Sequence, residues 1–293
     1  MRINTNVSSL VAQEANKNTS NNISSSLEKL STGYKINKAS DDASGLAIAD
    51  KLRTQASGLN QAVANGNSAV TLTQIADKAM AEQSNILDVI KQKLIQAGTA
   101  TTSSEGIQAI GKDIGKLLDQ INNIAKQTTY NGTSLLQQSA GGTAATATLT
   151  FQMGTTSSDT IKTDGSVQSN TAGMATLGTA VSAAATAWAA TAPVSAGSAQ
   201  ASARSMLVNI DSALTKLNGW RADFGSTQNQ LESSIRNLMT QVTNTKAAES
   251  VIRDVDYAQE SANFNKQNII SQAGTYAISQ ANSTSQNVMR LLQ

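Results

Sequence analysis

Hydrophobic residues recur at alternating steps of three and four along much of this sequence, most clearly between residues 105 and 127. Such spacing places the apolar side chains on one face of a helix that packs against other helices. We call the line of residues that makes this packing the seam of a helix. The seam predicted here consists of Ile107, Ile110, Ile114, Leu117, Ile121 and Ile124.

A longer helix is predicted over about residues 44–97. It follows Ser40, Asp41 and Asp42, whose side-chain oxygens can cap free amide groups and complement the helix dipole. Its seam slips by two residues after Val70, and the helix could be interrupted there. The predicted seam is Leu52, Ala56, Leu59, Val63, Gly66 and Val70, then Leu72, Ala76, Ala79, Gln83, Ile86, Ile90 and Leu94.

The longest unbroken pattern covers residues 207–242. At about 1.5 Å per residue this helix exceeds roughly 50 Å, more than a compact domain requires. Two polar residues, Arg221 and Gln228, lie on its predicted seam. Either they are locally solvated or hydrogen-bonded, or they set the register between helices. The predicted seam is Leu207, Ile210, Leu214, Leu217, Arg221, Phe224, Gln228, Leu231, Ile235, Leu238 and Val242.

Both ends of the chain carry weaker helical patterns. Of the first 40 residues, 18 are Ser, Thr or Asn, a composition that favours disorder. We expect these helices to order only against partners, with Ile3, Val7 and Leu10 lying against the apolar end of the chain. The predicted self-assembly core is Ile3, Val7, Leu10, Ile23, Leu27, Leu30, Ile270, Ala277, Ala281, Val288, Leu291 and Leu292.

The middle of the chain has a different pattern. Asn131-Gly132 is a favoured tight-turn pair, and alternation through Phe151 predicts a strand that pairs with a second one near Ile161. Residues 138–203 are rich in Ala, Thr, Gly and Ser. We expect this stretch to hold the β-hairpin and a short, variable, surface-exposed insert.

These elements predict a mainly α fold, an elongated coiled-coil or helix-bundle rod. Both termini pair at one end of the rod, and a small β-hairpin region lies at the other. We expect three parts: a terminal coiled-coil domain, a helical-bundle wall domain and the insert. Their bounds are 1–45 plus 255–293, 46–137 plus 204–254, and 138–203. The wall-domain seam is Leu52, Leu59, Val63, Ile107, Ile110, Ile114, Leu117, Ile121, Leu214, Leu217, Phe224, Leu231, Ile235 and Leu238.

Composition narrows the function. The chain has no cysteine and no histidine, which excludes a disulfide framework and removes both the usual general base and the commonest metal ligand. The HExxH motif of zinc proteases is therefore absent. We interpret Asp41 and Asp42 as capping groups rather than a catalytic pair, and expect no enzymatic activity, cofactor or metal.

Charge and hydropathy exclude two further classes. Charged residues make up 14% of the chain, with a formal net charge of +2 and no Lys/Arg cluster, so we expect no nucleic-acid partner. Residues 165–203 carry no charge, yet Ala alternates there with Ser and Thr, which argues against a membrane span. The first residues lack the apolar core of a secretory signal peptide.

Several long motifs, in a consistent order, resemble those of the bacterial flagellins. At the amino-terminal side these are INTNVSSLVAQ from Ile3, LEKLSTGYKINKASDDASGLAIADKLR from Leu27 and YNGTSLL from Tyr130. FQMG from Phe151 is similar to a hairpin strand of that family. At the carboxy-terminal side IRDVDYAQE and ANSTSQNVMRLLQ are similar to its end. The resemblance covers roughly three quarters of the chain.

The resemblance implies a subunit that self-assembles into the bacterial flagellar filament for motility, in a helical homopolymer outside the cell. Its terminal helices would be disordered in the monomer and fold on polymerisation. Expected partners are the flagellar cap and hook-filament junction proteins, an export chaperone and the type III export apparatus, with export lacking a cleaved signal peptide. The family alternative is another axial flagellar protein, such as a hook-filament junction protein.

One stretch departs from the family. Many flagellins carry QRVRELAVQ, which a Toll-like innate receptor recognises, whereas this chain has Asp88, Val89, Ile90, Lys91, Gln92, Lys93, Leu94, Ile95 and Gln96. Val89 replaces the first arginine, so the resemblance implies weak or no activation of that receptor. O-linked sugars on the Ser/Thr-rich insert are a further hypothesis at the level of the family.

Overall fold

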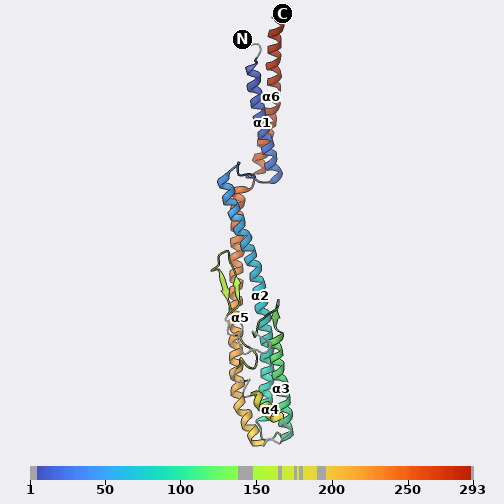
Figure 1. The fold of residues 1–293 in the computed structure, drawn as a ribbon, viewed down its shortest axis with the longest axis vertical. Coiled ribbons are helices and arrows are strands. Elements are labelled where there is room, and N and C mark those ends of the chain that lie inside the picture. The colour runs from blue at the N-terminus through green and yellow to red at the C-terminus, as the bar shows by residue number, and fades with distance from the viewer. Residues whose placement is uncertain are drawn as a thin grey trace. The chain divides into compact units, whose positions relative to one another are not determined.

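A computed structural model describes residues 5–137, 148–163, 167–174, 177, 181–189 and 196–291, with only the backbone of residues 196, 285 and 288–291. The predicted mainly α fold, with long paired helices and small two-stranded sheets, is confirmed (Figure 1). The helices are α1 Val7–Thr32, α2 Ala43–Ala97, α3 Ser104–Gln127, α4 Ser182–Ala189, α5 Ala196–Arg253 and α6 Tyr257–Leu291. The strands are β1 Thr129–Tyr130, β2 Thr133–Ser134, β3 Thr150–Gln152 and β4 Thr160–Lys162.

The chain divides into two compact units, which we describe separately. The first unit comprises residues 1–57 and 242–293, and the second comprises residues 58–241. The division into three parts that the sequence suggests remains a prediction.

In the second unit, α3 and α5 both run antiparallel to α2 (Figure 1). Two contacts join α2 to α3: Lys93 Nζ lies 2.8 Å from Asp113 Oδ2, and the Gln83 amide donates to the backbone oxygen of Ile121 at 3.0 Å. Ser103 accepts a hydrogen bond from the amide of Gly106 and caps the start of α3. The loop between α2 and α3 is short, so these two helices form a hairpin.

The seam of α2 is continuous within the second unit, so the predicted slip after Val70 is wrong. At two levels the seam consists of Ala62 and Ala69, whereas the sequence pattern had assigned it to the adjacent residues Val63 and Val70. Those two valines are only half-buried. Small side chains carry little hydrophobic signal but permit close helix approach. The observed seam is Leu59, Ala62, Gly66, Ala69, Thr73, Ala76, Met80, Gln83, Leu87, Ile90, Leu94 and Ala97.

Predicted seam residues are buried at four of the six positions of α3 and at every second position of α5 from Ile210 to Leu238. These buried residues are Ile107, Ile110, Ile114, Ile121, Ile210, Leu217, Phe224, Leu231 and Leu238. Leu52 of the first unit and Leu117, Leu214 and Ile235 of the second are half-buried. Arg221 and Gln228 are also half-buried flanking residues, because the seam passes instead through Ala213, Trp220 and Thr227.

The described part of residues 138–203 does not behave as a wholly exposed insert, which corrects that expectation. Besides Ala199 and Ala203 of α5, six of its hydrophobic side chains enter the same core as α2, α3 and α5. Backbone groups of the segment also bond to amides of the helices: Gln83 donates to the Ser169 oxygen at 3.1 Å, and Asn122 accepts from the Thr171 amide at 3.0 Å. The buried side chains are Val167, Met174, Leu177, Val181, Ala185 and Trp188.

The predicted turn and the predicted strand pair are both confirmed. Asn131 and Gly132 have φ of 49° and 79°, the positive values of a type I′ turn, and join β1 to β2. Phe151 of β3 pairs with Ile161 of β4 in an antiparallel hairpin. No described helix has an apolar stretch long enough to cross a bilayer.

The β3–β4 hairpin contacts α2 where α2 has a glycine. A Cβ atom added at Gly66 would lie 2.7 Å from Met153 Cε and 2.8 Å from Ile235 Cγ1. Since atoms that close must move, the hydrogen of this glycine allows α2, α5 and the hairpin to meet.

We expect Gly66→Val to lower the free energy of unfolding of the second unit by about 1–3 kcal/mol, because the added methyl groups overpack this contact. The matched control is Gly219→Val on α5, where an added Cβ meets nothing within 4 Å. That control should change stability by less than about 0.5 kcal/mol. Denaturant unfolding followed by circular dichroism measures both, and equal effects of the two changes would contradict the prediction.

Candidate functional site

The first unit buries very little apolar surface. Among its described residues the buried hydrophobic side chains are Ile36, Ala49, Ala56 and Val242. By contrast, most of the exposed large hydrophobic residues of the described chain belong to this unit. They are Val7, Leu10, Val11, Leu27, Tyr34, Ile48, Val251, Tyr257, Ile269, Ile270 and Tyr276.

Helices α1 and α6 lie side by side and antiparallel in this unit (Figure 1). Asn6 Nδ2 donates to the Ala281 oxygen at 3.0 Å, and Ser271 Oγ donates to Asn16 Oδ1 at 3.4 Å. Most of the residues between the helices are small or polar. The seam of α1 is Ser9, Ala12, Asn16, Thr19, Ile23, Ser26 and Leu30, and that of α6 is Glu260, Phe264, Gln267, Ser271, Gly274, Ile278 and Ala281.

This arrangement corrects the predicted pairing of the chain ends. Val7 and Leu10 are 60% and 54% exposed, so α6 does not cover them. Leu27, Ile270 and Ala277 are also exposed, whereas Ile23, Leu30 and Ala281 are half-buried in the seam. Ile3 and Leu292 lie outside the described residues, as do the side chains of Val288 and Leu291.

Each terminal helix therefore has a second apolar stripe that faces away from its partner. At about 100° per residue, Val7, Leu10 and Val11 lie opposite the seam of α1. Ile269 and Tyr276, 67% and 75% exposed, lie seven residues apart on the outer side of α6. The sequence prediction did not include Val11, Ile269 or Tyr276, although the seven-residue spacing of the last two is a visible signal. We call these outward residues the outer stripes.

The ends of α1 and α5 meet in a compact joint within the first unit. Gly33 ends α1 with φ of 77°, and Tyr34 pairs with Asp254 in an antiparallel bridge. The Lys35 amide donates to the Arg253 oxygen at 2.6 Å, and the Arg253 guanidinium lies 4.3 Å from the centre of the Tyr34 ring. Backbone pairing and a cation–π contact thus fix where the two chain segments cross.

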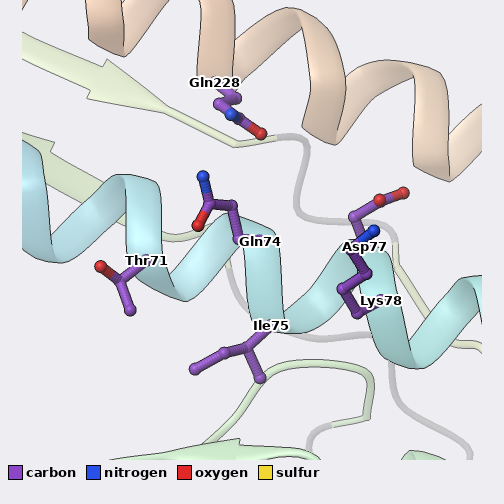
Figure 2. Close-up of a pocket in the computed structure, with 6 residues that line it drawn as sticks. All are labelled: Thr71, Gln74, Ile75, Asp77, Lys78 and Gln228. Carbon is purple, nitrogen blue, oxygen red and sulfur yellow. The ribbon is translucent and has the colours of Figure 1, made fainter.

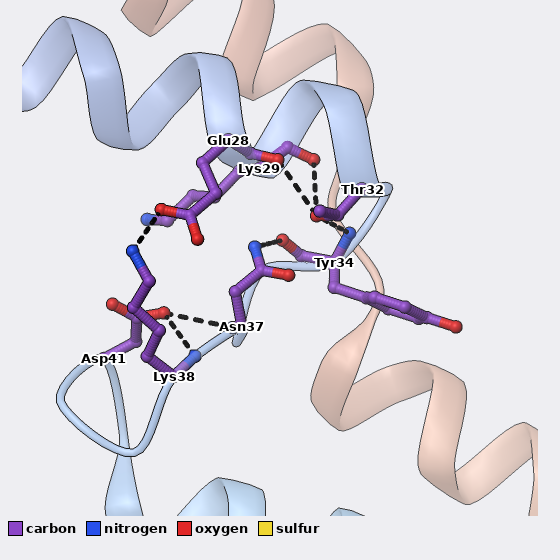
Figure 3. Close-up of polar contacts among 7 residues, drawn as sticks. All are labelled: Glu28, Lys29, Thr32, Tyr34, Asn37, Lys38 and Asp41. Carbon is purple, nitrogen blue, oxygen red and sulfur yellow. Dashed lines mark hydrogen bonds and ion pairs between the residues drawn. The ribbon is translucent and has the colours of Figure 1, made fainter.

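The carboxylates of Asp41 and Asp42 accept hydrogen bonds from backbone amides in and just after the loop between α1 and α2. Figure 3 shows this for Asp41. Asp41 Oδ2 accepts the amide hydrogens of Asn37 and Lys38, both at 3.0 Å. Both bonds hold the pKa of Asp41 below its ordinary value, and the bond from Lys38 has the larger effect. Asp42 accepts a hydrogen bond from the Gly45 amide at 2.9 Å and caps the start of α2, which confirms its predicted capping role. Asp41 instead bonds to amides within the loop.

Lys38 also crosses back to α1 (Figure 3), where its Nζ lies 2.6 Å from Glu28 Oε2. This bond raises the pKa of Lys38. The loop is therefore tied to the end of α1 as well as to the start of α2.

In the second unit a groove of about 690 Å³ lies between α2 and α5 (Figure 2). Its Asp77 carboxylate is engaged by Arg221 Nε at 2.9 Å. Across the described residues, no cluster of His, Cys, Asp and Glu could hold a metal ion. The groove is lined by Thr71, Gln74, Ile75, Asp77, Lys78 and Gln228.

The segment that departs from the innate-receptor motif belongs to α2. Ile90 and Leu94 are fully buried in the helical core. Lys91 and Lys93 form ion pairs at 2.6 Å and 2.8 Å with acidic residues of α5 and α3. Asp88, Val89, Gln92, Ile95 and Gln96 are exposed.

Comparison with known proteins covers both ends of the chain. Residues 3–141 match the bacterial flagellin N-terminal helical region, and residues 207–292 match the bacterial flagellin C-terminal helical region. The flagellin of Bacillus subtilis (strain 168) is 37% identical over the whole of both chains. The flagellar filament 33 kDa core protein of Treponema phagedenis is 33% identical, also over the whole of both.

A solved structure, of a putative flagellar hook-associated protein from Vibrio parahaemolyticus, has a TM-score of 0.59. It is 12% identical and covers 73% of this chain and 99% of its own. At that identity the likeness shows the fold alone.

We expect the amide proton shifts of Asn37 and Lys38 to titrate with a midpoint below the ordinary Asp range as the pH is lowered. The pKa of Asp41 is lowered in the folded loop, so its contribution is present above the unfolded pKa and is lost as pH falls through the folded one. Two-dimensional NMR measures the shifts. Asp41→Asn should abolish this titration, and a midpoint above the ordinary Asp range would contradict the prediction.

Proposed function

Because this chain belongs to the bacterial flagellin family, and is thus a non-enzymatic, self-assembling subunit of the flagellar filament for motility, we propose that its first unit is completed only by neighbouring subunits. The outer stripes of α1 and α6 are the surfaces that neighbours would cover. The observation that carries this proposal is the exposure of large apolar side chains on both helices of the α1·α6 pair.

The energetics support this. Ordering a residue costs about 1–2 kcal/mol, and burying a large apolar side chain returns about 1.5–3 kcal/mol. The seam between α1 and α6 contains mainly small and polar residues, so the pair recovers little of that cost by itself. Covering the outer stripes would supply the missing burial. We infer that α1 and α6 are largely disordered in the monomer and fold together during assembly.

Residues outside the described side chains complete this proposal. We assign Ile3, Val288, Leu291 and Leu292 to the same self-assembly core as Val7 and Leu10. Residues 1–45 and 255–293 then form the terminal domain that lines the filament core, residues 46–137 and 204–254 form its wall, and residues 138–203 supply the outer surface. The buried side chains of that last segment anchor it to the wall.

The export and assembly route that we propose follows from the incomplete burial of the first unit. An exposed apolar chain end requires protection before assembly, so we propose that an export chaperone holds it and that the type III export apparatus passes it out without a cleaved signal peptide. Assembly then occurs outside the cell, between the hook-filament junction proteins and the flagellar cap. The described Thr and Ser side chains at residues 155–158 are exposed and are candidates for O-linked sugars.

We expect Leu10→Asn, and equally Ile269→Asn, to abolish polymerisation while the second unit keeps its unfolding midpoint. Each change removes an apolar group that is exposed in the single chain and would be buried between subunits. Removal of residues 286–293 should have the same effect. Sedimentation and negative-stain imaging after seeding with filament fragments measure assembly.

Asn21→Ser is the matched control for these changes, since Asn21 is an exposed polar residue on the outer side of α1. This variant should assemble like the parent chain. Normal filaments from Leu10→Asn would show that the outer stripe of α1 is not an assembly surface.

The departure at Val89 generates a separate prediction. In a reporter assay for the Toll-like receptor, this chain should need at least a tenfold higher concentration than a flagellin with the full motif for half-maximal response. Val89 is 40% exposed, so Val89→Arg can be accommodated and should recover part of the response. Equal potency of this chain and the reference flagellin would overturn the prediction.

A further inference from the structure

Helices α2 and α5 pack through seams with a regular seven-residue repeat in the second unit. A regular repeat presents a similar surface after a shift of seven residues, so it does not by itself select one alignment of two antiparallel helices. The connection between them, residues 128–195, packs Val167, Met174 and Trp188 into the same core and so restrains α5. Beyond that restraint, side chains that break the repeat can select the register.

Ion pairs between charged side chains beside the seams join α2 to α5, and they do not recur every seven residues. Arg221 Nε lies 2.9 Å from Asp77 Oδ1, and both side chains are about one-third exposed. Lys91 Nζ lies 2.6 Å from Asp211 Oδ1. A third bond, from the Arg204 guanidinium to the Gly98 oxygen at 3.1 Å, caps the end of α2.

A shift of α5 by seven residues in either direction breaks both ion pairs. In one direction Lys91 would face Arg204, a residue of the same charge, and Asp77 would face Leu214. In the other direction Lys91 would face Asn218, and Asp77 would face Gln228. The observed register satisfies both pairs, and one of the shifted registers is penalised by repulsion.

We propose that the ion pairs Arg221–Asp77 and Lys91–Asp211 select the register in which α5 packs against α2. Arg221 is thus a positioning residue beside the seam rather than a polar residue within it. Single exposed ion pairs contribute little to the free energy of unfolding. The choice of register depends instead on the difference in free energy between the observed alignment of the two helices and the shifted ones. This role lies within the second unit of a single chain, so it does not depend on the assembly proposed above.

Cysteine cross-linking tests this in full-length monomer, since the chain has no cysteine of its own. Gln74 and Gln228 approach each other across the groove from α2 and α5 (Figure 2). Gln74→Cys with Gln228→Cys therefore reports the observed register. A shift of seven residues moves the two positions apart by about 10.5 Å along the helix, beyond disulfide reach. The initial rate of disulfide formation is measured on non-reducing gels.

In the chain that carries both cysteines, the added changes Arg221→Leu and Lys91→Met should lower the cross-linking rate at least twofold. Reversal of the pair by Asp77→Arg and Arg221→Asp should restore it relative to Arg221→Asp alone. The matched control is Lys93→Met with Arg53→Leu, which also removes two ion pairs, neither of which joins α2 to α5. The control should keep the parent rate.

Equal rates in the test and control variants would overturn the proposal and assign the register to the shape of the core. Circular dichroism monitors folding of every variant. If the double variant does not fold, Lys91→Met alone is compared with Lys93→Met alone, with the same expected difference.

Discussion

The close packing of small and polar residues between α1 and α6 is the constraint on which the first unit depends. Where Gly274 faces Asn16, an added Cβ would meet that side chain at 3.4 Å, and most side chains between the helices are small or polar, so the pair buries little. Large apolar side chains such as Leu10 and Tyr276 then have no place inside the pair and lie on its outside. The helical pairing itself leaves exposed the apolar surface that we propose neighbouring subunits cover.

The second unit uses the same three-and-four spacing with the opposite outcome. Its seams carry large side chains such as Ile114, Leu217 and Trp220, which are buried against one another. Burial of this kind lets a unit fold without neighbours. One periodic pattern thus gives a well-buried core where large residues occupy the seam, and a poorly buried helix pair where small ones do. The coupled folding and assembly that we propose would follow from this difference.

Local sequence patterns predicted the long helices, the Asn131-Gly132 turn, the pairing of Phe151 with Ile161 and the capping role of Asp42, because these depend mainly on residues close in sequence. It did not predict the face of α1 that contacts α6, since the outer apolar side chains of that helix carry a stronger hydrophobic signal than the small ones in its seam. The continuous seam of α2 was missed for the same reason at Ala62 and Ala69. The burial of Trp188 depends on contacts with residues far away in sequence, which no local pattern contains.

Residues that break the repeat explain how a repetitive sequence adopts one structure. A heptad pattern determines that helices pair, and it leaves their axial alignment open. In the first unit, the left-handed Gly33 and the Tyr34–Asp254 bridge occur once and align the two chain segments. In the second, Gly66 admits the hairpin at a single level of α2. Because a helical polymer repeats any misalignment of its subunit at every position, such unique contacts matter more to assembly than their individual contributions to stability suggest.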